Sequence, residues 1–142
     1  MNGKKNNPVT FASLDREKGI SELPPATSEE YPLPAWYRAV REIPLEELGI
    51  EDICKACRQQ IHLEHIIPMA LRMLQSNPLA GEMYDGELLV SLKSVPAEYW
   101  QKCGEDAATL KEVVEKALAF DTTSDEVRQD ANELLNKATH HQ

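Results

Sequence analysis

The sequence predicts an all-α fold, and three observations support this prediction. Apolar residues recur at helical spacing along most of the chain after residue 44. No segment alternates apolar β-branched and polar residues over the length of a strand. No apolar run reaches the ~20 residues that a membrane-spanning helix needs. We therefore expect a single compact helical domain of about five to seven helices around one core.

The N-terminal part of the chain differs from the rest. Residues 1–30 are polar, with few large apolar side chains, and Pro24 and Pro25 interrupt any helix there. We expect a flexible or loosely docked arm over residues 1–30, followed by a helical domain over residues 31–142. Near the start of that domain, residues 35–42 (AWYRAVRE) can form a short helix whose aromatic side chains join the core.

Two helical stretches are predicted in the centre of the chain. The apolar residues of the first fall on one helix face: Ile50, Ile53, Cys54, Cys57 and Ile61. Residues 63–74 continue the same period until Asn77-Pro78 ends it, but Pro68 lies inside this second stretch. Because proline removes a backbone donor and clashes one turn back, Pro68 either kinks the helix or begins a new one near Ile67.

Four further helices are predicted towards the C-terminus. A leucine-rich helix follows Asp85-Gly86 and ends before Pro96, which can be the first residue of a short helix. Apolar stripes predict one helix over residues 110–118 and another over residues 127–138. The preceding Thr123-Ser-Asp-Glu126 is typical of a capping box, with Thr123 as the cap and Glu126 reaching back to it.

The charge balance narrows the possible partners. The chain has 15 Lys and Arg against 24 Asp and Glu, a net charge of −9, of which −7 lies in residues 61–142. Direct binding of nucleic acid needs a basic patch, so we expect neither a nucleic-acid nor a membrane partner. Three cysteines cannot all pair, and the polar N-terminus lacks the apolar stretch of a secretory signal. Both features favour a reducing cytoplasm.

Acidic residues concentrate around three aromatic side chains. Residues 82–133 hold 13 acidic and 5 basic residues, and Tyr84, Tyr99 and Trp100 lie among them. Aromatic groups inside an acidic rim are typical of an interface that captures a cationic protein. The structural alternative is that the acids form a solvated helix surface while Tyr99 and Trp100 pack in the core beneath Pro96.

A candidate metal or redox site consists of Cys54, Cys57, His62 and His65. Two thiolates and two imidazoles can bind zinc tetrahedrally. However, no Gly or Pro supports the sharp turn near residues 59–61 that would bring the four ligands together. No strand precedes the CxxC motif, and both sulfurs lie on the apolar helix face, so core packing is the favoured interpretation. A small metal- or redox-sensing regulator is the alternative.

The chain carries no recognisable catalytic motif. It has no nucleotide-binding loop, no nucleophile elbow and no metal-bearing carboxylate ladder. In His62-Leu-Glu-His65 the histidines are three residues apart, whereas the zinc-protease motif spaces them four apart. We therefore expect a protein that is not an enzyme and holds no cofactor, with a hydrolase that uses an unrecognised carboxylate site as a further alternative.

The central segments also resemble a known family. These segments are Pro44-Leu45 with Leu48, Asp52 with Gln59 or Gln60, Ile67-Pro68 with Ala70-Leu71, Asn77-Pro78-Leu79-Ala80, and Tyr84-Asp85-Gly86-Glu87-Leu88-Leu89. In this order and spacing they resemble the helical immunity proteins of bacterial contact-dependent growth inhibition systems. The resemblance covers about residues 31–100 and does not include the CxxC motif.

The resemblance implies a non-enzymatic inhibitor that acts in the cytoplasm. Such a protein would bind and block the toxic C-terminal domain of a large contact-delivered protein. Those toxins are often nucleases, whose basic groove an acidic protein can cover.

We expect the toxin contacts where charge and aromatic residues coincide and on the penultimate helix: Glu82, Tyr84, Asp85, Glu87, Glu98, Trp100, Glu112 and Glu115. A structural alternative stays open. Tyr84-Asp85-Gly86-Glu87 can be scaffold, with Asp85 capping the following helix and Gly86 allowing the turn. The binding surface would then lie on the last two helices, at Glu112, Glu115, Asp121, Asp125 and Asp130.

Overall fold

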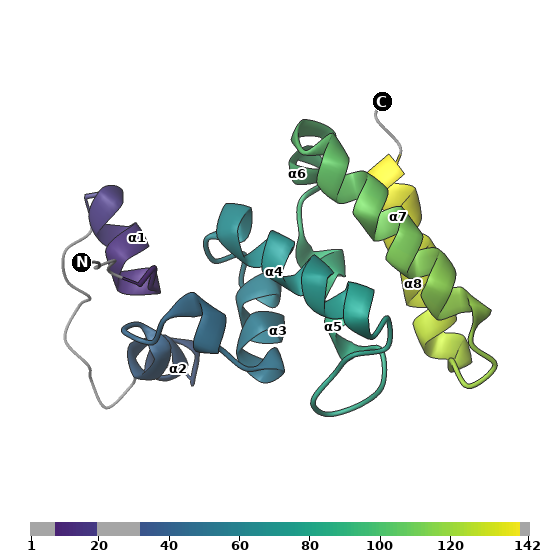
Figure 1. Cartoon of the computed structure of the whole chain (residues 1–142), viewed down its shortest axis with the longest axis horizontal. Coiled ribbons are helices and arrows are strands. Elements are labelled where there is room, and N and C mark those ends of the chain that lie inside the picture. The colour runs from purple at the N-terminus through teal and green to yellow at the C-terminus, as the bar shows by residue number, and fades with distance from the viewer. Residues whose placement is uncertain (1–7, 20–31, 140–142) are drawn as a thin grey trace, which may run out of the picture. The chain divides into compact units, whose positions relative to one another are not determined.

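The computed structural model describes residues 8–19 and 32–139, and all regular structure in these ranges is helical (Figure 1). It comprises eight α-helices and two 3-10 helices, which confirms the all-α prediction for the described residues. None of these helices is long and apolar enough to cross a bilayer. The chain divides into two compact units, Met1–Leu48 and Gly49–Gln142.

In the first unit, helices α1 (Phe11–Glu17) and α2 (Pro32–Val40) precede the 3-10 helix η1 (Leu45–Glu47). The buried Phe11 ring lies 6.3 Å from the ring of Trp36 and 5.3 Å from that of Tyr37, between ring centroids. The Tyr37 hydroxyl donates a 2.8 Å hydrogen bond to the Asp15 carboxylate, which also accepts from Arg41 Nε at 3.2 Å. The aromatic side chains predicted for α2 therefore join a small core.

Helix α1 lies in the segment that was expected to be an arm. Thr10 and Ser13 form a capping box there, in which each side chain accepts a hydrogen bond from the backbone of the other. Seven residues make too short a helix to be stable in isolation, so the burial of Phe11 holds it. Helix α1 was not among the predicted helices, and Pro24, Pro25 and the rest of residues 20–31 lie outside the described residues.

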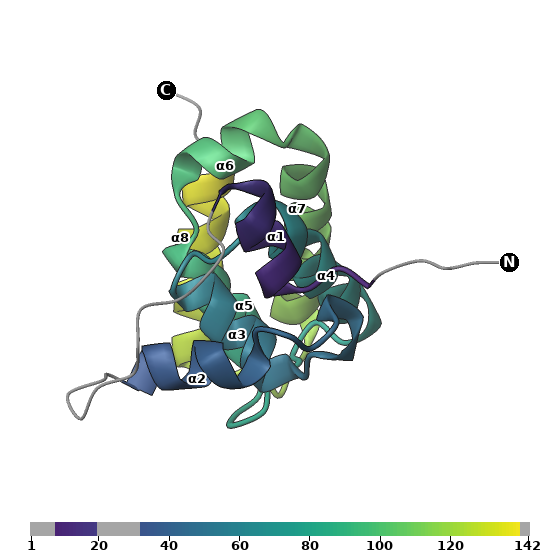
Figure 2. The same ribbon diagram turned by 90° about the vertical axis from the view of Figure 1, so that its left-hand side faces the viewer.

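The second unit contains all the remaining elements. They are α3 (Ile50–Arg58), α4 (Leu63–Ser76), α5 (Glu87–Ser91), η2 (Leu92–Ser94), α6 (Ala97–Lys102), α7 (Gly104–Ala119) and α8 (Asp125–Thr139). Helix α3 packs against α4 and α5, and α4 packs against α7. Helices α7 and α8 form an antiparallel pair, with α6 against one end of it (Figure 1 and Figure 2).

The core of the second unit is formed by the apolar stripes that the sequence predicted. Its largest fully buried side chains are Ile53, Ile66, Ile67, Leu74, Leu88, Leu89, Leu92, Val95, Trp100, Leu110 and Leu134. Burial of one such side chain stabilises the fold by about 1.5–3 kcal/mol. Trp100 is therefore part of the core, as the structural alternative for this residue predicted.

The helix break in the centre of the chain lies at residues 59–62 and not at Pro68. Gln60 and His62 have φ angles of 57° and 46°, in the left-handed region, and they turn the chain between α3 and α4 without glycine or proline. Helix α4 is continuous through Pro68. Of the two alternatives for Pro68, the one in which a new helix begins near Ile67 was therefore wrong. An interior proline costs about 3 kcal/mol through a lost hydrogen bond and a clash one turn back. The buried apolar face of α4 offsets this cost.

The predicted capping box at Thr123 was also wrong. Ser124 caps α8, because its hydroxyl accepts the Val127 backbone N–H at 3.1 Å. The Thr123 hydroxyl instead donates to the carbonyl of Ala117 at the end of α7, at 2.6 Å. One residue therefore caps the start of α8 while its neighbour satisfies the end of α7.

Candidate functional site

The loop at residues 81–86, between α4 and α5, carries three of the predicted contact residues at the surface. Glu82, Tyr84 and Asp85 are exposed, and so is Met83, which was not among the predicted contacts. The exposed fractions of Met83 and Tyr84 are 76% and 50%. Met83 is adjacent to Tyr84 in a loop bounded by Gly81 and Gly86. This pattern in the sequence could have identified Met83 as an exposed apolar residue.

Glu87 has a different role from its neighbours in this loop. Its side chain is only 5% exposed. One carboxylate oxygen accepts the backbone N–H groups of Glu82 and Met83, both at 2.8 Å, and the other lies 3.6 Å from Arg58 Nη1. Glu87 therefore fixes the backbone of the 81–86 loop and has little surface left for a partner.

Two glycines hold the same loop in a tight conformation. A Cβ atom at Gly81 would collide with the backbone oxygen of Tyr84 and come within 2.8 Å of the Glu87 Cβ. Gly86 has a φ of +91°, and a Cβ there would lie 2.8 Å from Val127 Cγ1 of α8. The loop therefore packs against its own backbone at Gly81 and against α8 at Gly86.

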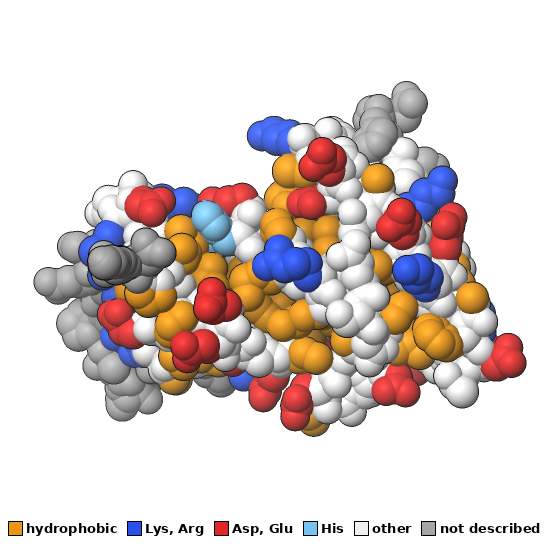
Figure 3. Space-filling view, viewed as in Figure 1, with side chains coloured by type: hydrophobic (Ala, Val, Ile, Leu, Met, Phe, Trp, Pro, Cys, Tyr) orange, Lys and Arg blue, Asp and Glu red, His pale blue; other side chains and the backbone are white. Residues whose placement is uncertain are grey.

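A cleft of about 720 Å³ separates the 81–86 loop from the connection between α7 and α8 and the first turns of α8. Its lining consists of Leu79, Tyr84, Asp85, Thr122, Thr123, Ser124, Glu126, Val127, Gln129 and Asp130. Three of these described residues are acidic and none is basic. Figure 3 shows acidic side chains along the lower edge, where the 81–86 loop and the α7–α8 connection lie in Figure 1.

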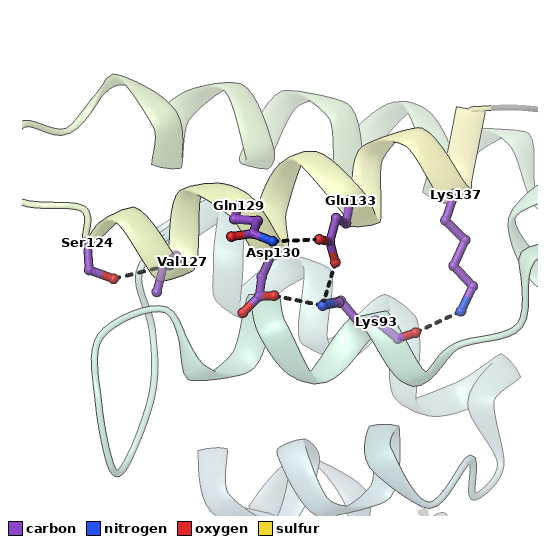
Figure 4. Close-up of polar contacts among 7 residues, drawn as sticks. All are labelled: Lys93, Ser124, Val127, Gln129, Asp130, Glu133 and Lys137. Carbon is purple, nitrogen blue, oxygen red and sulfur yellow. Dashed lines mark hydrogen bonds and ion pairs between the residues drawn. The ribbon is translucent and has the colours of Figure 1, made fainter.

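The three carboxylates of the cleft differ in how they are partnered. Asp130 forms a 2.7 Å ion pair with Lys93, which also contacts Glu133 at 2.8 Å (Figure 4). These two carboxylates raise the pKa of Lys93, so Lys93 stays charged beside them. Asp85 and Glu126 have no ion-pair partner among the described residues. Their charges are therefore available to a cationic group that enters the cleft.

The other predicted contact residues lie away from this cleft. Glu98 is exposed on α6, and Glu112 and Glu115 are exposed on α7. Trp100 is fully buried, with its ring perpendicular to that of Tyr99 at 5.4 Å between centroids. The structure thus brings Tyr84 and Asp85 together with Glu126 and leaves Glu112 and Glu115 on a separate helix.

The four residues of the alternative metal site do not form one. Cys54 and Cys57 are buried on α3, whereas His65 is exposed on α4. Within residues 8–19 and 32–139 no group of three or more His, Cys, Asp or Glu side chains is placed to hold a metal ion. Burial raises the pKa of Cys54, and it raises the pKa of Cys57 from 9.0 to about 12. Both thiols therefore behave as core groups.

A profile of the family described as CDI immunity proteins matches residues 19–119. The protein belongs to this family. The match confirms the resemblance to immunity proteins of contact-dependent growth inhibition systems that the central segments indicated. A comparison with individual curated proteins gave no match.

The region matched as CDI immunity protein contains one wall of the cleft but not the other. The 81–86 loop lies inside residues 19–119, whereas α8 begins at Asp125, beyond the matched region. Immunity proteins of this kind act on a toxin protein, so a protein-binding surface is the functional site to be sought. The sequence could not indicate Glu126 as part of it, because Glu126 meets the loop only through the packing of α8.

Proposed function

We propose that this CDI immunity protein acts in the cytoplasm, where it binds the C-terminal toxin domain of a contact-delivered protein and blocks it by occupancy, without catalysis. The match to the family over residues 19–119 carries this proposal. The helical scaffold and the exposed acidic side chains support it, because they offer a rigid and negatively charged surface to a basic protein.

We further propose that the toxin is a nuclease. A nuclease presents basic side chains to the phosphate backbone, and a chain with a net charge of −9 is complementary to such a surface. The inhibitor must capture the toxin before damage accumulates, so we expect a dissociation constant of about 1 nM or lower.

Co-expression with the toxin domain encoded beside this chain tests the proposed function. Cells that make both proteins should grow, cells that make the toxin alone should lose nucleic acid, and the two proteins should co-purify. Soluble immunity protein that neither protects nor co-purifies would contradict the proposal. Protection without loss of nucleic acid in the unprotected cells would retain the immunity role and reject the nuclease.

The salt dependence of association tests the charge argument separately. If opposite charges steer the encounter, the association rate should fall by about tenfold or more between low and high ionic strength. The dissociation rate should change much less, because it depends on contacts within the formed complex. An association rate that does not depend on salt would show that the acidic surface does not steer the toxin.

A further inference from the structure

We propose that the cleft between the 81–86 loop and the start of α8 is the surface on which a basic segment of the toxin domain docks, with Met83 and Tyr84 as its apolar anchors. This inference rests on the proposed function and adds the place of binding and the chemistry of the segment bound. Three features of the second unit support it: exposed apolar side chains, a pre-formed loop and unpaired negative charge.

Exposed apolar side chains lie in the 81–86 loop and in the connection between α7 and α8. Only four large apolar residues are exposed among the described residues, namely Val9, Met83, Tyr84 and Phe120. Met83 and Tyr84 are adjacent in the loop, and Phe120 lies two residues before the cleft-lining Thr122. Tyrosine and methionine are enriched in protein interfaces, where a few such groups supply most of the affinity.

The loop that presents Met83 and Tyr84 is already ordered in the free protein. The buried Glu87 carboxylate accepts the backbone N–H groups of Glu82 and Met83, and Gly81 permits the close approach of the Tyr84 backbone. At the other end, Gly86 packs against Val127 of α8. A loop fixed before binding loses little conformational entropy on docking, so its contacts contribute more fully to affinity.

The charges of the cleft indicate the chemistry of the docked segment. Asp85 and Glu126 come from opposite walls and lack ion-pair partners among the described residues, and Tyr84 lines the same cleft. An arginine or lysine side chain that enters the cleft finds carboxylates to pair with and an aromatic ring in the same lining. An acidic or purely apolar segment would leave these carboxylates desolvated without a partner.

A matched pair of charge reversals tests the docking site. The double variant Asp85→Lys with Glu126→Lys changes the cleft, and Glu112→Lys with Glu115→Lys makes the same change in net charge on exposed positions of α7. Both variants weaken long-range attraction to a similar degree, but only the first removes the proposed contacts. With the purified toxin domain encoded beside this chain, we expect the cleft variant to bind about 100-fold more weakly and the α7 variant less than about 5-fold more weakly.

Truncation of the apolar anchors provides a second comparison. Tyr84→Ala and Met83→Ala should each weaken binding by about 10-fold or more, mainly through faster dissociation. Val9→Ala removes an exposed apolar side chain of the first unit and should leave binding unchanged. Thermal unfolding of each variant checks that its fold is retained, which is expected because all these side chains are exposed.

Hydrogen exchange on the unmodified chain makes the test independent of any variant. In the complex, backbone amides of residues 81–86 and 122–130 should be protected relative to the free protein. Protection confined to other helices, or an equal loss of affinity in the two charge-reversal variants, would overturn the cleft as the docking surface. A toxin domain that does not bind the unmodified chain would instead reject the proposed function.

Discussion

Glu87 and Asp85 are both acidic residues of one short loop region, yet they serve opposite purposes. The Glu87 carboxylate is buried and accepts two backbone N–H groups, while Asp85 is exposed and lines the cleft. Buried polar groups need partners, and a carboxylate that accepts N–H groups makes strong hydrogen bonds. At this scale, function depends on what surrounds each side chain rather than on residue type.

We expect replacement of Glu87 to destabilise the protein. Glu87→Ala leaves the Glu82 and Met83 amides without their acceptor and should lower the free energy of unfolding by about 2–4 kcal/mol. Glu87→Gln should have a smaller effect, because the amide oxygen can still accept both hydrogen bonds. Glu82→Ala, a change at the surface of the same loop, should stay within about 0.5 kcal/mol of the unmodified protein. Urea denaturation measures all three, and equal effects of Glu87→Ala and Glu82→Ala would contradict this role.

The cysteines should differ in reactivity towards an alkylating reagent. The thiolate is the reactive form, and burial raises the pKa of Cys54 and raises that of Cys57 to about 12. Cys103 is partly exposed at the start of α7. Treatment of the folded protein with iodoacetamide at about pH 8 should therefore modify Cys103 alone, as mass spectrometry would show. All three should react in denaturant, and rapid modification of Cys57 in the folded protein would contradict its burial.

At the scale of elements, the junction of α7 and α8 depends on a few polar groups that satisfy helix ends. Ser124 caps α8, Thr123 bonds the Ala117 carbonyl, and Arg128 donates to the carbonyls of Leu118, Phe120 and Thr123. Helix ends leave backbone groups unpaired, and these side chains supply the missing partners. The same junction forms one wall of the cleft, so helix capping also shapes the proposed docking surface.

The cap assignment gives a prediction for α8. Ser124→Ala should lower the free energy of unfolding by about 1 kcal/mol and increase hydrogen exchange in the first turn of α8. Thr123→Val keeps the shape of the side chain but removes its hydroxyl, so we expect weakened protection at the end of α7 instead. Hydrogen exchange measured by NMR distinguishes the two. Greater fraying of α8 in the Thr123 variant would instead support the capping box centred on that residue.

At the scale of the whole molecule, two half-buried tyrosines and two buried cysteines make stability depend on pH under alkaline conditions. Burial raises the pKa of Tyr99, and so does its hydrogen bond to Asp106. Burial and the hydrogen bond to Asp15 likewise raise the pKa of Tyr37. Together with Cys54 and Cys57, these acids must stay protonated in the folded state. Unfolding releases their protons more readily, so alkaline conditions favour the unfolded chain.

We therefore expect stability to fall as the pH rises above 9. For Cys57, the contribution is fully present below its ordinary pKa of 9.0 and is lost as the pH rises towards its folded value of about 12. Urea denaturation at pH values from about 7.5 to 10.5 measures this slope. Cys57→Ala should make the decline shallower, because the variant lacks one of the titrating groups. A stability that stays constant or rises over this range would contradict the prediction.

Most helices could be predicted from the sequence because helical periodicity is a local pattern. The apolar stripes of α3, α4, α7 and α8 repeat within a few residues and specify both the helix and its buried face. Helix α1 was missed because its seven residues carry too short a pattern, and its stability comes from contacts with α2. The family segments were recognised for a similar reason, since they are short and keep their order along the chain.

The candidate site could be predicted only in part. Tyr84 and Asp85 were recognisable as loop residues among acids, but Glu126 was not singled out as part of the same cleft, nor Met83 as an exposed residue of the loop. Nothing in the residue order distinguishes the exposed Asp85 from the buried Glu87, or Ser124 as a cap from Thr123. Each of these differences depends on hydrogen bonds and packing between specific backbone and side-chain atoms.

The residue order alone specified a negatively charged helical chain and the family to which it belongs, because charge and helical periodicity follow from residue type and near neighbours. Only the folded molecule placed α8 beside the 81–86 loop, buried Glu87 and Trp100, and left Tyr84, Asp85 and Glu126 around one cleft. The physical reason is that exposure and ion pairing arise from contacts between residues far apart in the chain, and such contacts exist only once the helices pack.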